Sequence, residues 1–136
     1  MEQNMPKVFI SYAFDDAKDA QSLVNALHEK SVVGWLDSAD LATGEAISSA
    51  VREALKSSVA VIVLLSQRAL QSQWVQFEIG AAEALEKKII PVMLSGDVKA
   101  EQLPDILRNR QWIDGRDRPT EDVAREVMRA IGSAQK

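Results

Sequence analysis

The chain has 136 residues, of which 46% are hydrophobic and 26% are charged. This composition is typical of one folded domain and excludes a disordered chain. The net charge of −4 and the scattered basic residues give no basic patch for nucleic acid or an anionic membrane. No cysteine is present, which excludes disulfides and thiolate metal sites, and no metal site is expected. The polar start and the short apolar runs predict a cytoplasmic protein without a signal peptide or membrane span.

Short apolar runs alternate with amphipathic segments along the chain. The runs predict five strands, at residues 7–12, 32–37, 59–65, 89–94 and 111–114. Helices are predicted between and after them, beginning at Asp15 or Asp16, after Gly44, at Ser72 (running to about Lys87) and at Thr120, with a short helix at 102–107. Residues 66–71 are predicted to be a connection. Pro91 cannot donate to a strand ladder, so it is expected near a strand end or an interruption.

Strict alternation of strands and helices, with no linker, predicts one α/β domain over residues 1–136, with its core at about 7–132. The expected fold is a flavodoxin-like three-layer sandwich with a five-stranded parallel sheet in the order 2-1-3-4-5. In this order, ligands bind beyond the carboxyl ends of the first and third strands. The segments expected to converge there are residues 11–15, residues 37–44, and Ser66 with the residues after it.

The helix predicted from Ser72 to about Lys87 carries an acid on its apolar side. With a step of about 100° per residue, the side chains of Trp74, Phe77, Ala81 and Leu85 form an apolar stripe along the helix. Glu78 falls on the same side of the helix as this stripe. A carboxylate on an apolar face is costly unless it is paired or hydrogen-bonded. Two interpretations are therefore open: a structural Glu78 satisfied by a backbone group or an arginine, or a Glu78 that does chemistry at the border of a pocket.

The sequence lacks the residues that most reactions and binding functions found on this fold require. The strand ends do not carry the acids of a phospho-acceptor domain, and the turn after the first strand is not a phosphate loop. The lone histidine, His28, lies at the wrong end of its helix for a catalytic triad. Hydrolysis by two carboxylates would need a partner for Glu78, with Asp15, Asp37 and Asp40 as candidates.

Cleavage of the bond between nicotinamide and ribose in NAD needs only one carboxylate. The nicotinamide leaves as a neutral molecule, and a carboxylate in a dry pocket can stabilise the oxocarbenium-like transition state. Trp74 or Phe14 could stack on a base of the substrate. Tyr12 and Phe14 are candidate pocket residues, whereas Trp112 is expected in the core.

Four segments resemble the Toll/interleukin-1 receptor (TIR) domain of bacterial type. They are Phe9-Ile10-Ser11-Tyr12, Trp35-Leu36-Asp37 followed by Leu41 and Gly44, Val63-Leu64-Leu65-Ser66, and Ser72-x-Trp74-x-x-x-Glu78. Their order and spacing carry the resemblance over about residues 7–131.

The resemblance implies that Glu78 is the catalytic residue of an NAD glycohydrolase or cyclase. The products would be nicotinamide with ADP-ribose or a cyclic ADP-ribose isomer, in bacterial antiphage defence. It implies a substrate site that includes Ser11, Tyr12, Phe14, Asp37, Leu41, Ser66 and Trp74. NAD is the expected substrate, and no cofactor is expected.

The resemblance also implies self-association, or binding to other TIR domains, through residues 37–44. This loop lacks the Arg-Asp-x-x-Pro-Gly signature of animal receptors, which favours an enzyme over receptor-style docking. The alternatives are a non-catalytic TIR scaffold and, less favoured, a nucleoside-transferring enzyme, whose substrates share the N-glycosidic bond.

Overall fold

The structure is a computed structural model that describes residues 5–36 and 49–134. Asp37, Leu41 and the rest of the 37–44 loop lie outside the described residues. No helix in this part of the chain is long and apolar enough to cross a membrane. The helices and strands are β1 (Lys7–Ser11), α1 (Ala17–His28), β2 (Val33–Leu36), α2 (Ser49–Ser57), β3 (Ala60–Leu65), α3 (Gln67–Gln71), α4 (Gln73–Ala84), β4 (Lys88–Met93), α5 (Asp105–Arg108), β5 (Ile113–Asp114) and α6 (Thr120–Ala134).

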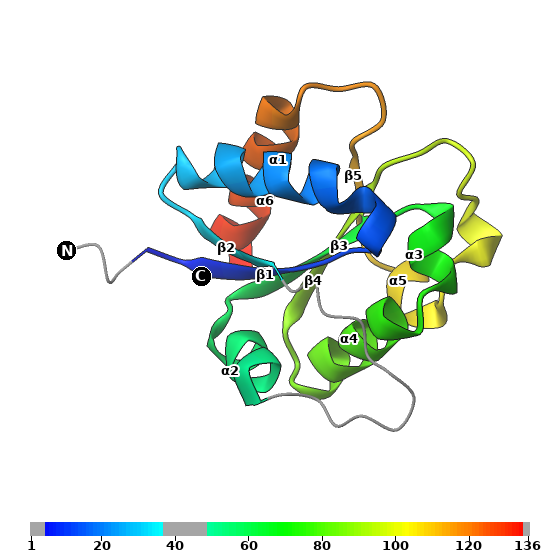
Figure 1. Ribbon diagram of the computed structural model, residues 1–136, viewed down its shortest axis with the longest axis horizontal. Coiled ribbons are helices and arrows are strands. Elements are labelled where there is room, and N and C mark those ends of the chain that lie inside the picture. The colour runs from blue at the N-terminus through cyan, green and yellow to red at the C-terminus, as the bar shows by residue number, and fades with distance from the viewer. Residues whose placement is uncertain (1–4, 37–48, 135–136) are drawn as a thin grey trace.

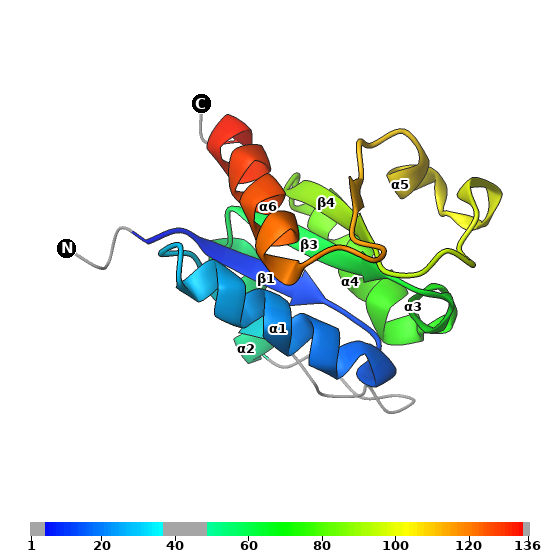
Figure 2. The same ribbon diagram turned by 90° about the horizontal axis from the view of Figure 1, so that it is seen from above.

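The strands form one parallel sheet in the order β2-β1-β3-β4-β5, which confirms the predicted fold. Helices α1 and α6 cover one face of the sheet, and α2 and α4 cover the other (Figure 1, Figure 2). In the register of β1 and β3, Ser11 lies opposite Val63. The carboxyl ends of these two strands therefore lie next to each other at the same end of the sheet.

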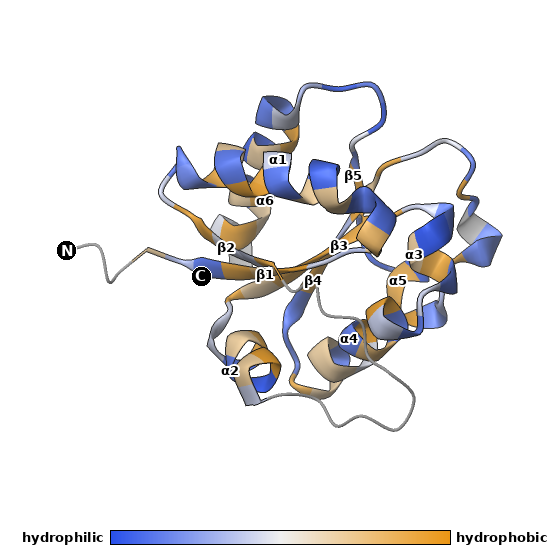
Figure 3. Cartoon of the chain, viewed as in Figure 1, coloured by the Kyte–Doolittle hydropathy of each residue, from blue (hydrophilic) through white to orange (hydrophobic). Residues whose placement is uncertain are grey.

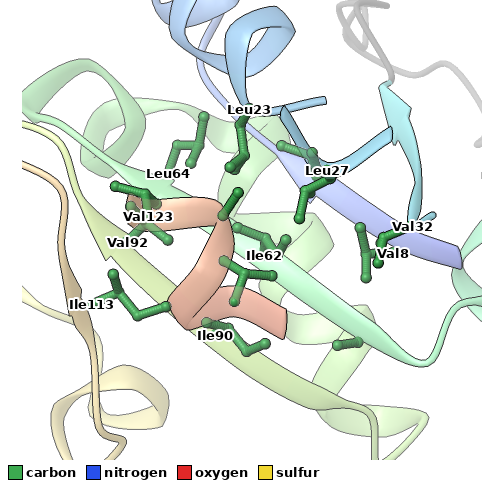
Figure 4. Packing of buried hydrophobic residues seen from close by; sticks show 14 of the residues in the cluster. Val8, Leu23, Leu27, Val32, Ile62, Leu64, Ile90, Val92, Ile113 and Val123 are labelled. Carbon is green, nitrogen blue, oxygen red and sulfur yellow. The ribbon is translucent and has the colours of Figure 1, made fainter. Parts of the chain in front are cut away.

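Two apolar layers hold the helices to the sheet. Under α1 and α6, strand residues such as Ile62 and Val92 pack with Leu23, Leu27 and Val123 of the helices (Figure 4). The other layer packs alternate strand residues against α2, α4 and α5. All of β3 is buried, because both of its faces are covered, and the sheet centre is correspondingly apolar in Figure 3. Burial on both faces explains why β3 is a continuous aliphatic run.

Pro91 lies inside β4, which extends from Lys88 to Met93, rather than near a strand end. The Leu94 N–H donates to Leu65 of β3, whereas the Met93 carbonyl accepts from Gly115 on the β5 side. Backbone groups of alternate residues point the same way along a strand, so Pro91 faces the β5 side with Met93. Because pairing with β5 involves only Val92 and Met93, the missing N–H of Pro91 removes no ladder hydrogen bond.

Three local predictions differ from the structure. Residues 66–71, expected to be a connection, contain the short helix α3, which begins because the Ser66 side chain accepts a hydrogen bond from Ala69 N. Helix α4 ends at Ala84 instead of about Lys87. Trp112, expected in the core, is 46% exposed, with the Arg116 guanidinium 5.6 Å from the ring centroid.

The buried face of α4 also differs from the predicted one. Its buried residues are Trp74, Val75, Glu78, Ile79 and Ala82. Two residues of the predicted apolar stripe, Phe77 and Leu85, are 41% and 39% exposed. Because α4 has apolar residues nearly all around, its periodicity does not fix which side meets the sheet.

A pair of glycine substitutions tests this packing. A Cβ on Gly115 would lie 2.9 Å from the Met93 carbonyl oxygen and 3.1 Å from Val92 Cγ1, so Gly115→Ala should lower the free energy of unfolding by about 1–3 kcal/mol. A Cβ on Gly80, within α4, meets no atom within 4 Å, so Gly80→Ala should raise it by about 0.5–1 kcal/mol. Urea unfolding of both variants measures these changes; equal effects would contradict the packing described around Gly115.

Candidate active site

Glu78 is fixed at the carboxyl end of β1. Its side chain is only 1% exposed and lies on the face of α4 that meets the sheet. The Ser11 hydroxyl donates a hydrogen bond of 2.5 Å to Glu78 Oε1. Ser11 is the last residue of β1 and is itself buried. The carboxylate therefore lies beside the junction of β1 and β3, where ligands bind in sheets of this order.

Local sequence explains how these two side chains meet. Phe9 of β1 packs in the layer under α2 and α4, and residues two apart on a strand share a face, so Ser11 points to the same layer. On α4, the Ser72 hydroxyl accepts a hydrogen bond from Val75 N at 3.1 Å. This N-cap sets the start of α4 and places Glu78 in its second turn.

A second pair of polar side chains links the ends of β1 and β3. Ser66, directly after β3, donates a hydrogen bond of 2.5 Å to Asp16 Oδ2. Burial raises the pKa of Asp16 above its ordinary value of 3.8; the Ser66 hydrogen bond opposes the rise, and the nearby charges of Asp19 and Asp15 add to it. Arg68 forms an ion pair with Asp15 at 2.5 Å. Polar groups thus occupy the carboxyl ends of both central strands.

Helix α4 carries two aromatic side chains, Trp74 and Phe77, just before Glu78. Trp74, one helical turn before Glu78, is buried and stacks on Phe77 with ring centroids 6.2 Å apart. The Trp74 Nε1 atom is buried and has no hydrogen-bond partner among the residues that the structure describes. Trp74 therefore lies on the buried face of α4, one helical turn from Glu78.

The structure brings together some of the predicted site residues. Ser11, Glu78 and Trp74 lie in the layer under α4. Ser66 follows the neighbouring strand β3 and donates its hydrogen bond to Asp16. Tyr12 is buried in the opposite layer, with α1 and α6.

Phe14 follows β1 in a short 3-10 turn and is 68% exposed. The predicted residues Asp37 and Leu41 are outside the described part.

The partnership of Asp16 with Ser66 was not predicted. The sequence predicts Asp15 or Asp16 as a helix cap. Asp16 is the N-cap residue of α1, but its side chain makes no capping hydrogen bond there. A signal was present, because Asp16 and Ser66 each follow one of two strands that are neighbours in the predicted order. Two polar residues after adjacent parallel strands are expected to meet at the sheet edge.

Comparisons with known proteins identify the family of this chain. Residues 8–129 match the TIR domain family. The chain is 30% identical over 129 residues to the stimulator of interferon genes protein of Magallana gigas, covering 89% of this chain and 31% of that protein. It is 28% identical over 130 residues to the NAD(+) hydrolase TcpA of Theionarchaea archaeon (strain DG-70-1), covering 91% and 39%.

A solved structure supports the fold independently. The TIR domain of the Toll-related receptor TRR-2 from Hydra magnipapillata superimposes with a TM-score of 0.72 at 22% identity, covering 92% of this chain and 97% of that one. This similarity concerns the fold alone. The chain spans less than two fifths of the length of the two relatives above.

The raised pKa of Asp16 predicts a pH dependence of stability. A carboxyl whose pKa is higher in the folded state destabilises the fold increasingly as pH rises from 3.8 through the folded value. Asp16→Asn keeps an oxygen that can accept from Ser66 but cannot ionise. Its free energy of unfolding, relative to the parent, should therefore increase as pH rises from about 3 to 7.

Asp114→Asn supplies a control of opposite sign. The hydrogen bonds from Arg116 lower the pKa of Asp114 to about 2, so the parent gains stability as pH rises through the range from 2 to 3.8. This variant should lose stability relative to the parent over that range. Chemical unfolding at a series of pH values measures both; an Asp16→Asn difference that does not change with pH would contradict the assigned role of burial.

Proposed function

The chain belongs to the TIR domain family, and on this basis we propose that it cleaves the bond between nicotinamide and ribose in NAD. The observation that carries the proposal is the buried carboxylate of Glu78, held by Ser11 at the carboxyl end of β1. The similarity to an NAD(+) hydrolase supports the same chemistry. We place the products in bacterial defence signalling, as the family resemblance implies.

The proposed reaction assigns Glu78 an electrostatic role. As the C–N bond breaks, the bonding electrons go to the nicotinamide nitrogen, and nicotinamide leaves neutral. Positive charge then builds up on the ribose, where a fixed carboxylate in a dry site stabilises it. Attack by water gives ADP-ribose and a proton; attack by a nitrogen of the adenine gives a cyclic isomer. Ser11 acts as a positioning residue, because its hydrogen bond orients the carboxylate.

The burial of Glu78 bears on how the substrate enters. With 1% of its side chain exposed, the carboxylate contacts NAD only after neighbouring groups move. We infer that the active conformation opens when TIR domains associate through residues 37–44. Association would then supply the free energy for opening, so that activity depends on protein concentration.

A TIR scaffold without enzymatic activity is the second candidate function. The observation in its favour is the same burial, because a buried carboxylate that accepts a hydrogen bond from Ser11 can serve stability alone. The similarity to a stimulator of interferon genes protein is compatible with this role. The two functions differ in whether the charge of Glu78 is needed for turnover.

Removal of that charge is the decisive test. Glu78→Gln keeps the shape and can still accept a hydrogen bond from Ser11, but nicotinamide release should fall about a hundredfold or more, the scale for losing one transition-state stabiliser. The fold should persist, because removing a buried charge can be neutral or stabilising. Ser11→Ala, which keeps the charge, should reduce turnover less.

The matched control is Glu53→Gln, which removes an exposed carboxylate on α2 and should leave turnover unchanged. Nicotinamide release is measured with folded proteins in the same association state. Turnover near the parental rate in Glu78→Gln would refute the electrostatic role. No release by the parent at any concentration would favour the scaffold.

A separate prediction concerns the 37–44 loop. Leu41→Arg places a charge in a loop of mostly small side chains, so it should weaken association and reduce turnover per molecule without unfolding the domain. The specific rate of the parent should rise with protein concentration, and that of the variant should rise less. Specific rates that are the same for both proteins, and constant over a hundredfold range of concentration, would contradict a role for this loop.

A further inference from the structure

A groove with apolar walls is lined by residues of α2 and α4, the two helices on the lower face of the sheet in Figure 1. It has a volume of about 420 Å³, and its walls are formed by Leu55, Phe77, Ala81, Ala84 and Leu85. Phe77 and Leu85 are two of the few large hydrophobic residues that remain exposed. The groove thus contains the part of the predicted apolar stripe that does not meet the sheet.

Two cations border this groove. Arg52 and Lys56 line it from α2, and residues four apart lie on the same side of a helix. Neither side chain forms an ion pair with any residue in the described part of the chain. Among the residues that the structure describes, no acidic side chain lines the groove. An apolar surface with uncompensated positive charge at one side complements a molecule with an apolar body and an anionic head.

We propose that this groove binds a free amphiphilic carboxylate with a single alkyl chain, of the fatty acid class. The alkyl chain lies along Phe77, Ala81 and Leu85, and the carboxylate meets Arg52 and Lys56. The volume falls within the range of small-molecule sites, about 300–1,000 Å³, which are mostly apolar with a few polar groups that fix orientation. A helix of a partner protein would need a longer row of anchor pockets.

This site is distinct from the candidate active site. Glu78 lies on the face of α4 that meets the sheet, whereas Phe77 and Ala81 lie on the flank that faces α2. The proposal does not depend on NAD cleavage, because its test measures binding. Its failure would leave the proposed function untouched, and the reverse also holds.

The test is titration of the isotope-labelled protein with decanoate and, separately, with uncharged decanol, followed by amide chemical shifts. Decanoate should shift the amides of α2 and α4 and bind at least tenfold more tightly than decanol. The double variant Arg52→Glu and Lys56→Glu should weaken decanoate binding at least tenfold and leave decanol binding unchanged. Lys18 of α1 is an exposed cation without an ion pair to residues 5–36 or 49–134; Lys18→Glu is the matched control and should bind decanoate as the parent does.

Filling the groove tests its walls. Ala81→Trp should abolish decanoate binding, and Phe77→Asp, at a site exposed enough to tolerate a charge, provides a second variant with the same expected loss. No binding at millimolar decanoate, shifts outside α2 and α4, or equal binding of decanol would overturn the proposal. So would concentration-dependent shifts of α2 and α4 without ligand that vanish in Ala81→Trp, since a second copy of the chain would then occupy the groove.

Discussion

The hydrogen bond from Ser11 to Glu78 joins two residues that are 67 positions apart in the chain. A carboxylate inside an apolar layer is costly unless a donor stabilises it, and a hydroxyl that donates to an ionised oxygen forms one of the stronger hydrogen bonds in proteins. The bond therefore constrains how α4 sits against β1. Apolar packing alone would allow other rotations of a helix with so many apolar residues.

This rotation of α4 has two consequences on different sides of the helix. Because Glu78 faces the sheet, Val75, Ile79 and Ala82 fill the space around it. Phe77 and Ala81 are then turned toward α2, where they form one wall of the groove. The stacked pair of Trp74 and Phe77 connects the two sides. The same rotation of α4 thus accounts for both the location of the carboxylate and the apolar surface outside the core.

Much of the fold could be predicted from the sequence, because it depends on patterns that act over short distances. Alternation of apolar runs with amphipathic helices predicted the parallel sheet and its strand order. Glu78 could be predicted as a candidate site residue because it interrupts an apolar face. The structure shows that it is buried at the carboxyl end of β1. The partners Ser11 and Asp16 depend on which strands become neighbours and on which way each side chain points.

The predictions that the structure contradicts failed for the same reason, because they concern contacts between residues that are distant in the chain. The face of α4 was assigned from periodicity, but in an apolar helix the orientation is decided by a contact with a distant strand. The helix α3 was missed because a helix of five residues has almost no periodicity, and the cap at Ser66 was its only signal. Trp112 was assigned to the core from its residue type alone, although a large aromatic residue can stay exposed when a cation such as Arg116 covers its ring.

The position of Pro91 affects whether β4 can pair with a strand of another molecule along the part that β5 does not cover. Only Val92 and Met93 of β4 pair with β5, so the residues before them form a strand edge that has no strand partner in the described part of the chain, although all but Lys88 are buried. Such an edge can serve as a template on which the strands of other molecules add, the first step toward fibrillar aggregates. Pro91 faces that edge without an N–H to offer, so an incoming strand would meet a gap in the ladder. The proline thus removes one hydrogen-bond donor from the side of β4 on which another strand could add.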